Sequence, residues 1–250
     1  MNQKKGERST GRTQGIRWIG IDGCPAGWFY VAIDAEDDFS FGVLAEFGEL
    51  APLLKKAERV LVDMPIGLPS EQTPLRACEG LARNVLGKRR FSVFSVPARS
   101  VLTVSTYEEA NEKNRRVLGV GLSRQSWNIL PKIRQLDDFL RGNPDSRIHE
   151  MHPEVAFWAL NGKTPMQHSK RRQAGLDERL VLLQRHYSKS AECFENARLA
   201  FLKREVASDD IVDAMVGAVT AVQGPKLRSF PAEPPTDSEG LEMKMVYAEL

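Results

Sequence analysis

Three short apolar stretches near the start of the chain constrain its fold most. They cover Ile16–Asp22, Trp28–Ile33 and Phe39–Ala45, and short segments of turn-forming residues separate them. Runs of this length, rich in β-branched and aromatic residues and bounded by turn residues, are typical of strands joined in consecutive antiparallel hairpins. The sequence therefore predicts a three-stranded meander.

A helix and a fourth strand are expected directly after the meander. Apolar residues recur at helical spacing over residues 50–57, and the apolar stretch 60–62 then ends in Asp63. The order strand, strand, strand, helix, strand places the chain in the α/β class. Its length of 250 residues allows one large α/β domain or two small ones.

The rest of the chain is predicted to be mainly helical. Residues 1–15 are expected to form a disordered basic tail, residues 16–250 a single domain, and residues 70–145 a helical insertion within it. Four prolines between residues 225 and 235 favour an extended linker. The later elements expected are helices near 74–86, 107–117, 126–140, 153–160, 176–187 and 208–222, a strand at 148–151 and an edge strand at about 241–248.

The composition is that of an ordinary globular protein, with 42% hydrophobic and 27% charged residues. No apolar run approaches the roughly 20 residues that span a bilayer, and the polar N-terminus lacks the apolar segment of a secretory signal. Three widely separated cysteines suggest neither a disulfide framework nor a zinc site. We therefore expect a cytoplasmic protein without a membrane partner.

Two aspartates stand at the ends of predicted buried strands. Asp22 ends the first strand, beside a loop whose glycines permit close backbone approach, and Asp63 ends the fourth. Each has a sufficient local explanation as a turn residue that accepts hydrogen bonds from backbone amides. Two such aspartates on neighbouring strands also fit a functional site, so both interpretations stay open.

A third group of carboxylates lies in the predicted helix 208–222. Asp210 and Asp213 are three residues apart, so on a helix their side chains share one face. Helix capping by Ser208, with Asp209 and Asp210 in the first turn, is a good account of those residues. It fails for Asp213, which lies between small apolar residues on the face expected to press against the sheet.

Convergent carboxylates point to a metal site. No basic residue lies within sequence reach of these aspartates, so they would raise one another's pKa values unless a divalent cation compensates them. Oxygen ligands without histidine or cysteine favour Mg²⁺ or Mn²⁺. The predicted ligands of one or two such ions are Asp22, Asp63, Asp210 and Asp213.

Further catalytic candidates lie after the strand predicted at 148–151. Glu154 could act as an additional ligand, and His152 could act as a ligand or a proton shuttle. The alternative interpretation is a helix N-terminus with Pro153 at its first position and Glu154 in its first turn.

The order of these motifs resembles a known family. The chain, from residue 16 to about 250, is similar to the domain-of-unknown-function family 429 (DUF429), which is described as predicted nucleases with a ribonuclease H-like fold. The resemblance implies a mixed sheet of three antiparallel strands followed by parallel ones, flanked by helices. The motifs that carry it are Gly20-Ile21-Asp22-Gly23-Cys24-Pro25-Ala26-Gly27-Trp28, Asp63-Met64-Pro65-Ile66-Gly67-Leu68, Arg90 with Ser92-Val93-Phe94, Gly121-Leu122-Ser123 with Gln125, Glu150 with His152-Pro153-Glu154, and Asp209-Asp210 with Asp213-Ala214.

A more distant similarity to RuvC-type Holliday-junction resolvases implies specific ligands. It would make Asp22 and Asp63 strand ligands, and Asp210 and Asp213 helix ligands. Asp63 replaces the glutamate that those resolvases usually carry, and an aspartate has the shorter reach.

Basic residues of the insertion are consistent with a nucleic-acid partner. Arg76, Arg83 and Arg90 are spaced by seven and would align if one helix continued that far. Such residues bind phosphate without sequence preference, although a solvated helix face is the alternative. Phe91 could stack on bases or belong to the core. The predicted substrate-binding residues are Arg76, Arg90, Ser123, Gln125 and Lys132.

The leading hypothesis is a metal-dependent nuclease that hydrolyses phosphodiester bonds of DNA or RNA. One alternative is a catalytically silent nucleic-acid-binding or assembly module of the same fold. A second is an ATP-binding phosphotransfer protein of the actin-like superfamily, which ordinarily needs two copies of this domain, whereas the sequence contains no internal repeat. The alternating C-terminal segment could extend a sheet of another copy, so a homodimer is possible.

Overall fold

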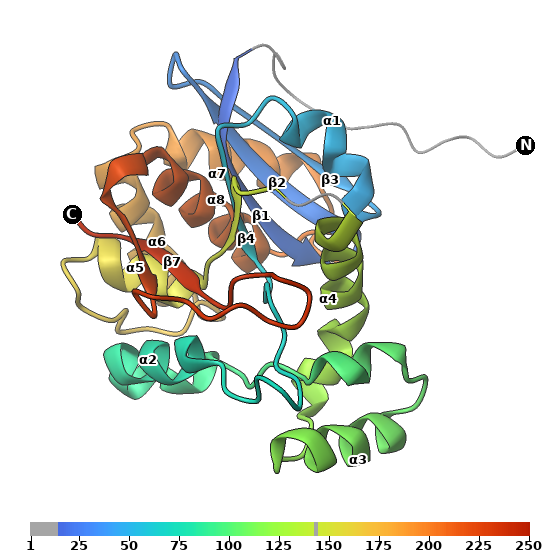
Figure 1. The fold of residues 1–250 in the computed structure, drawn as a ribbon. Coiled ribbons are helices and arrows are strands. Elements are labelled where there is room, and N and C mark those ends of the chain that lie inside the picture. The colour runs from blue at the N-terminus through green and yellow to red at the C-terminus, as the bar shows by residue number, and fades with distance from the viewer. Residues whose placement is uncertain (1–14, 143–144) are drawn as a thin grey trace, which may run out of the picture. The chain divides into compact units, whose positions relative to one another are not determined.

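The computed structural model describes residues 15–142 and 145–250 (Figure 1). The predicted tail therefore lies outside the described residues, except for Gly15. Contacts within the chain divide it into two compact units. The first contains the chain up to Asp63 together with Met166–Pro225, and the second contains Met64–Pro165 and Lys226–Leu250. The segment predicted as a helical insertion lies within the second unit.

The first unit is built on the predicted meander. Strands β1 (Ile16–Cys24), β2 (Gly27–Asp34) and β3 (Phe39–Leu44) pair in antiparallel order. After the short helices η1 (Phe47–Leu50) and α1 (Ala51–Leu54), strand β4 (Arg59–Asp63) pairs in parallel with β1. The strands of this unit therefore lie in the order β3-β2-β1-β4. The predicted α/β fold class, with antiparallel and parallel strands in one sheet flanked by helices, is confirmed.

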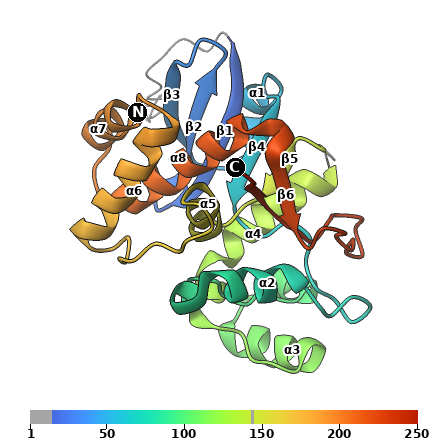
Figure 2. The ribbon, with the colours of Figure 1, turned by 90° about the vertical axis from the view of Figure 1, so that its left-hand side faces the viewer.

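Helix α8 (Ser208–Val222) packs directly on this sheet, as both ribbon views show (Figures 1 and 2). A Cβ atom added to Gly20 of β1 would lie 2.0 Å from the carbonyl oxygen of Ala214 and 2.3 Å from the amide nitrogen of Ala218. Every residue from Ile211 to Ala221 is buried. Gly20 is therefore what allows the helix backbone to approach the strand this closely.

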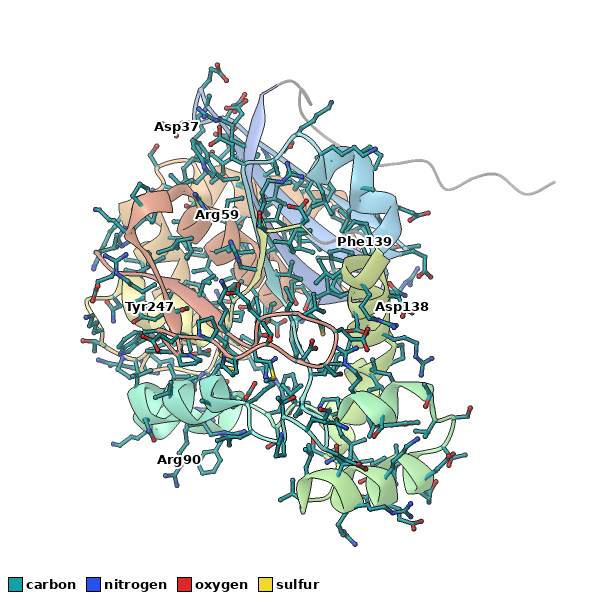
Figure 3. The ribbon with its side chains drawn as sticks, viewed as in Figure 1. Asp37, Arg59, Arg90, Asp138, Phe139 and Tyr247 are labelled. Carbon is teal, nitrogen blue, oxygen red and sulfur yellow. The ribbon has the colours of Figure 1, made fainter. Side chains whose placement is uncertain are left out.

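A side chain of the sheet also fixes the far end of this helix. The Nη1 atom of Arg59, at the start of β4, donates a 2.7 Å hydrogen bond to the carbonyl oxygen of Ala221 near the end of α8 (Figure 3). The last carbonyl groups of a helix have no partner within the helix, so the cationic guanidinium satisfies one of them and complements the helix dipole. Strand β4 and helix α8 are thus linked at the end where the strand begins.

Two further helices complete the first unit. Helix α6 (Gln173–His186) was predicted at 176–187, whereas α7 (Ser190–Ala200) was not predicted. The buried positions of α7, including Cys193, Phe194 and Ala197, recur every three to four residues, but polar residues occupy most of its other positions. Both helices pack on α8, and α7 also contacts β3.

The second unit contains the predicted insertion and the C-terminal segment. Its core groups residues of α2, α5 and β7, and the ring of Tyr247 lies 4.5 Å from that of Phe230 and 5.6 Å from that of Trp158 (Figure 3). Its elements are α2 (Ala77–Leu86), η2 (Gly87–Ser92), η3 (Arg99–Thr103), α3 (Tyr107–Leu118), α4 (Arg124–Gly142), β5 (Ile148–Glu150), α5 (Pro153–Leu160), β6 (Leu227–Phe230) and β7 (Met245–Ala248).

The C-terminal segment differs from its prediction in one respect. Strand β6 occupies part of the stretch predicted to be an extended linker, and it pairs in antiparallel order with β7. The predicted edge strand is present over its last residues, and its partner strand belongs to the same chain. The prolines do not prevent the pairing of β6 with β7, because Pro225 precedes β6 and Pro231 follows it. Among the described residues, the helices are all too short or too polar to span a bilayer.

Candidate functional site

The first unit brings three of the predicted aspartates together. Asp22 and Asp63 are direct register partners at the ends of the parallel strands β1 and β4. Asp213 comes from α8, which covers the face of β1 to which Gly20 belongs, and Asp22 shares that face because side chains two residues apart on a strand point the same way. Carboxylate oxygens of the three residues lie within 4.8 Å of one another. We call these three residues the aspartate triad.

Burial and charge repulsion act on the aspartate triad in the same direction. Asp22 is 7% exposed and Asp213 is fully buried. Burial raises the pKa of Asp22 well above its usual range, and the neighbouring charges of Asp63 and Asp213 raise it further. The ionised triad therefore favours the arrival of a cation.

A lysine that the sequence reasoning did not find lies in this cluster. The ammonium group of Lys170 forms an ion pair and a hydrogen bond with the Oδ2 atom of Asp213, and its side chain is 30% exposed. The neighbouring charge of Asp213 raises the pKa of Lys170, against the opposing effect of burial. Lys170 is 43 residues away in sequence, and the only signal was its membership of a basic stretch with Arg171 and Arg172.

Asp210 has a capping role beside the aspartate triad. Its Oδ2 atom accepts a 2.9 Å hydrogen bond from the amide of Ala207, which precedes the helix as its N-cap, so the predicted cap at Ser208 is displaced by one residue. Burial raises the pKa of Asp210 to about 6, with contributions from Asp209 and Asp213. The role of Asp210 as a metal ligand stays a prediction, because its carboxylate already serves the helix terminus.

Arg76, one of the predicted phosphate contacts, is buried in the second unit. Its Nη2 atom lies 2.8 Å from both carboxylate oxygens of Glu150, and its Nε atom lies 2.8 Å from Glu79. The Nη1 atom donates to the carbonyl oxygens of Ile66 and Gly67. This geometry favours a structural role over the predicted contact with substrate.

The same network contains a second group of possible metal ligands. Suitable atoms of Cys78, Glu79 and Glu150 lie within 4.8 Å of one another. The guanidinium of Arg76 hydrogen-bonds to all three side chains, so an internal cation already compensates these carboxylates. The condition for an alignment of Arg76 with Arg90 is not met, because α2 covers only Ala77–Leu86 and does not continue to Arg90.

His152 and Glu154 lie at the N-terminus of α5 in the second unit. His152 is the N-cap, Pro153 is the first helical residue and Glu154 lies in the first turn, which is the alternative arrangement considered for these residues. The Nε2 atom of His152 lies 3.3 Å from the carbonyl oxygen of Ser92, and Glu154 is paired with Arg89 at 3.3 Å. Their catalytic roles stay predictions.

The other predicted substrate contacts also belong to the second unit. The hydroxyl of Ser123 accepts a 2.9 Å hydrogen bond from the amide of Ser126, so it caps the first turn of α4. Gln125 is exposed and Lys132 is half-buried. Arg90 is exposed on η2, where its guanidinium lies 4.9 Å from the centre of the Phe91 ring (Figure 3).

The donor set of the aspartate triad suits a hard divalent cation. All three side chains offer oxygen, and three carboxylates with one lysine leave an excess of negative charge in a buried position. Mg²⁺ and Mn²⁺ prefer such ligands over the nitrogen and sulfur donors that zinc sites use. The residues present therefore fit the predicted metal.

One comparison with known proteins agrees with the resemblance to the DUF429 family. The chain matches the family described as "Protein of unknown function (DUF429)" over residues 20–236. This range includes Asp22, Asp63, Lys170 and Asp213. Searches of curated proteins and of solved structures gave no match. Because the match covers most of the sequence, the chain belongs to the DUF429 family.

Proposed function

We propose that this protein is a metal-dependent nuclease that hydrolyses phosphodiester bonds of nucleic acid. The observation that carries the proposal is the aspartate triad, whose carboxylate oxygens lie within 4.8 Å of one another on two neighbouring strands and one helix. Capping and turn formation do not explain the burial of Asp213 among α8 residues that face the sheet. A cation site does explain it, because a bound ion compensates carboxylates that otherwise repel each other.

In this proposal each part of the site has a defined task. Asp22, Asp63 and Asp213 would hold one or two Mg²⁺ or Mn²⁺ ions. A divalent cation supplies Lewis-acid stabilisation of a phosphodiester and makes a nucleophilic water available at neutral pH. The aspartates come from regular strands and a buried helix, so their positions are fixed before the substrate arrives and little reorganisation is needed.

The exposed side chains of η2 support a nucleic-acid substrate. Lys88 and Arg90 are exposed next to Phe91, whose side chain is 81% exposed. An exposed aromatic ring beside cationic groups can stack on a base while the cations contact phosphate. Stacking of this kind does not distinguish DNA from RNA, so the substrate class in the proposal is nucleic acid in general.

Cleavage assays with purified full-length protein test the proposal. Single-stranded, duplex, hybrid and branched nucleic acids are incubated with Mg²⁺ or Mn²⁺, and with a chelator as the blank. We expect metal-dependent cleavage that Asp22→Asn and Asp213→Asn each reduce by about 100-fold or more, since removal of a metal ligand lowers affinity or activity at least as strongly as removal of its outer partners. Asp177→Asn, an exposed carboxylate of α6, is the matched control and should cleave like wild type.

A silent binding module is the second candidate, and one observation favours it. The ion pair of Lys170 with Asp213 already compensates part of the negative charge, so the triad can persist without a metal. Nucleic-acid binding that survives the chelator, with no cleavage of any substrate under either metal, would favour this candidate over the nuclease. Equal cleavage by wild type and Asp22→Asn would contradict the nuclease proposal directly.

A further inference from the structure

Lys170 occupies a position that the surrounding structure builds for it. It lies in the short loop that precedes α6, and two side chains of that helix hold the loop. The Nη1 atom of the fully buried Arg179 donates to the carbonyl oxygens of His168 at 3.0 Å and Gly175 at 2.8 Å. Glu178 accepts hydrogen bonds from the amides of Gln167 at 2.7 Å and His168 at 2.9 Å.

Close packing at Gly175 also fixes the loop that contains Lys170. A Cβ atom added to Gly175 would lie 2.0 Å from the carbonyl oxygen of Ser169, so any other residue at this position would displace the backbone next to Lys170. The amide of Gly175 also donates a 2.9 Å hydrogen bond to the carbonyl oxygen of Arg172. A surface lysine that met Asp213 by chance would need none of these contacts.

We propose that Lys170 is an internal counter-cation of the aspartate triad that competes with a divalent metal ion for Asp213. In the metal-free protein its ammonium group compensates the triad, as the guanidinium of Arg76 compensates the carboxylates of the second unit. An ion held by all three aspartates would compete with Lys170 for the carboxylate of Asp213. The inference rests on the proposed metal site, and it concerns the binding of the ion rather than cleavage.

The displaced lysine has a defined use in the proposed reaction. Its side chain is 30% exposed, so solvent and solutes can reach part of it. Once Asp213 binds an ion, the ammonium group loses its partner there and is free to pair with an anion. A phosphate of the substrate is the anion that the proposed reaction brings to this site. Metal binding would thereby convert a structural ion pair into a substrate contact.

Calorimetric titration of the full chain with Mn²⁺ alone tests the competition without any activity measurement. Lys170→Met removes the competing charge, so we expect Mn²⁺ to bind roughly tenfold tighter, because a unit charge close to the ion site repels a divalent ion strongly. Lys189→Met is the matched control, since Lys189 pairs with Asp38 in an exposed ion pair of the same unit. It changes the net charge equally and should change Mn²⁺ affinity less than twofold.

A second variant moves Lys170 without changing any charge. Gly175→Ala should push the loop away through the contact with Ser169, and we expect tighter Mn²⁺ binding as in Lys170→Met. Gly80→Ala, at an open position of α2, is its control. Circular dichroism confirms that each variant is folded, and Lys170→Met alone decides the question if Gly175→Ala does not fold.

The outcomes separate this inference from the proposed function. The inference is overturned if Lys170→Met binds Mn²⁺ with an affinity equal to or lower than that of wild type. It is also overturned if neither wild type nor any of the variants binds Mn²⁺. In an Asp213→Asn background, Lys170→Met should raise the remaining Mn²⁺ affinity by less than it does in the wild-type background, because the contested ligand is gone and only the charge repulsion remains. Tighter Mn²⁺ binding by Lys170→Met in a protein that cleaves no nucleic acid supports the counter-cation and contradicts only the nuclease proposal.

Discussion

Asp22 and Asp63 are register partners on adjacent parallel strands, so the backbone pairing of β1 with β4 places two carboxylates side by side. Side chains at paired positions point to the same face of a sheet, and a parallel register brings both strand ends to the same edge. The repulsion between the two groups is therefore a property of the fold itself. A one-residue shift of either strand would remove it, and it would also turn the apolar residues of that strand away from the core.

Asp22→Asn should stabilise the metal-free protein. The substitution removes a buried charge that repels Asp63 and Asp213, and it keeps the size of the side chain. A gain of about 1 kcal/mol would raise the melting temperature by roughly 2–4 °C for a chain of this size. Thermal unfolding in a chelator measures this change in melting temperature. In a second measurement with Mn²⁺, the stabilisation expected for wild type should be absent from Asp22→Asn. A lower melting temperature than wild type in the chelator would contradict the prediction.

Asp210 should make the metal-free protein less stable as the pH rises from about 4 to about 6. Burial raises its pKa to about 6 in the folded protein, so across this range the folded state binds more protons than the unfolded state, and the free energy of unfolding falls as protons are lost. Asp210→Asn keeps an acceptor for the Ala207 amide but cannot ionise. Between pH 4 and pH 7, the free energy of unfolding of Asp210→Asn should therefore rise by about 2 kcal/mol relative to that of wild type. Urea unfolding in a chelator at pH 4 and at pH 7 measures the free energy of unfolding of both proteins. A difference between them that is the same at the two pH values would refute the prediction.

Gly20→Ala should destabilise the first unit severely. The added methyl group meets backbone atoms of α8 at 2.0 and 2.3 Å, and a helix backbone cannot move aside as a flexible side chain can. We expect the free energy of unfolding to fall by at least about 3 kcal/mol, which is at the upper end of the effects of overpacking a core. Gly80→Ala in α2 is the control, because nothing lies within 4 Å of the added atom. There alanine should stabilise the helix by up to about 1 kcal/mol.

Arg76 and Arg90 should respond to substitution in opposite ways. Arg76→Met leaves Glu79 and Glu150 buried without their cation, and breaking such a pair costs about 3–5 kcal/mol of stability. Arg90→Gln should leave the melting temperature unchanged, because this side chain is exposed. Urea unfolding and thermal unfolding measure these effects.

The two arginines should also differ in nucleic-acid binding. Arg90→Gln should weaken binding and reduce the slope of log affinity against log salt concentration by about 1, as expected for one lost phosphate contact. Fluorescence anisotropy in a chelator measures this. A slope that equals that of wild type would contradict the role of Arg90. Unchanged binding by folded Arg76→Met would agree with a structural role of Arg76.

Local patterns predicted most of the first unit because its elements carry strong local signals. The three meander strands, the parallel strand and α8 are apolar, and turn residues or prolines bound them. Helix α7 lacked such a signal, since its buried positions alternate with glutamates and other polar residues. Strand β6 was missed because nearby prolines suggested that no pairing was possible, although none lies within the strand.

The candidate site was predictable where the argument needed only periodicity. The positions of Asp22, Asp63 and Asp213 follow from strand ends and helix spacing, and the structure brings these residues together. Lys170 was not predictable, because its position depends on the loop before α6. The long side chain of Arg179 and a close backbone contact at Gly175 hold this loop. Burial of Arg76 was equally hidden, because a basic residue in a charged stretch normally faces solvent.

The link between Arg59 and Ala221 would bear on ion selectivity at the proposed metal site. From Asp63 back to Arg59 the strand covers four residues, about 13 Å, and from Asp213 to Ala221 the helix rises over eight residues, about 12 Å. The two elements are thus matched in length and fastened at the end remote from the carboxylates. In the proposed metal site, this anchor would help to set the gap between Asp63 and Asp213 without touching either residue. Substitutions at Arg59 would then shift the preference of the site between small and large cations without altering a ligand.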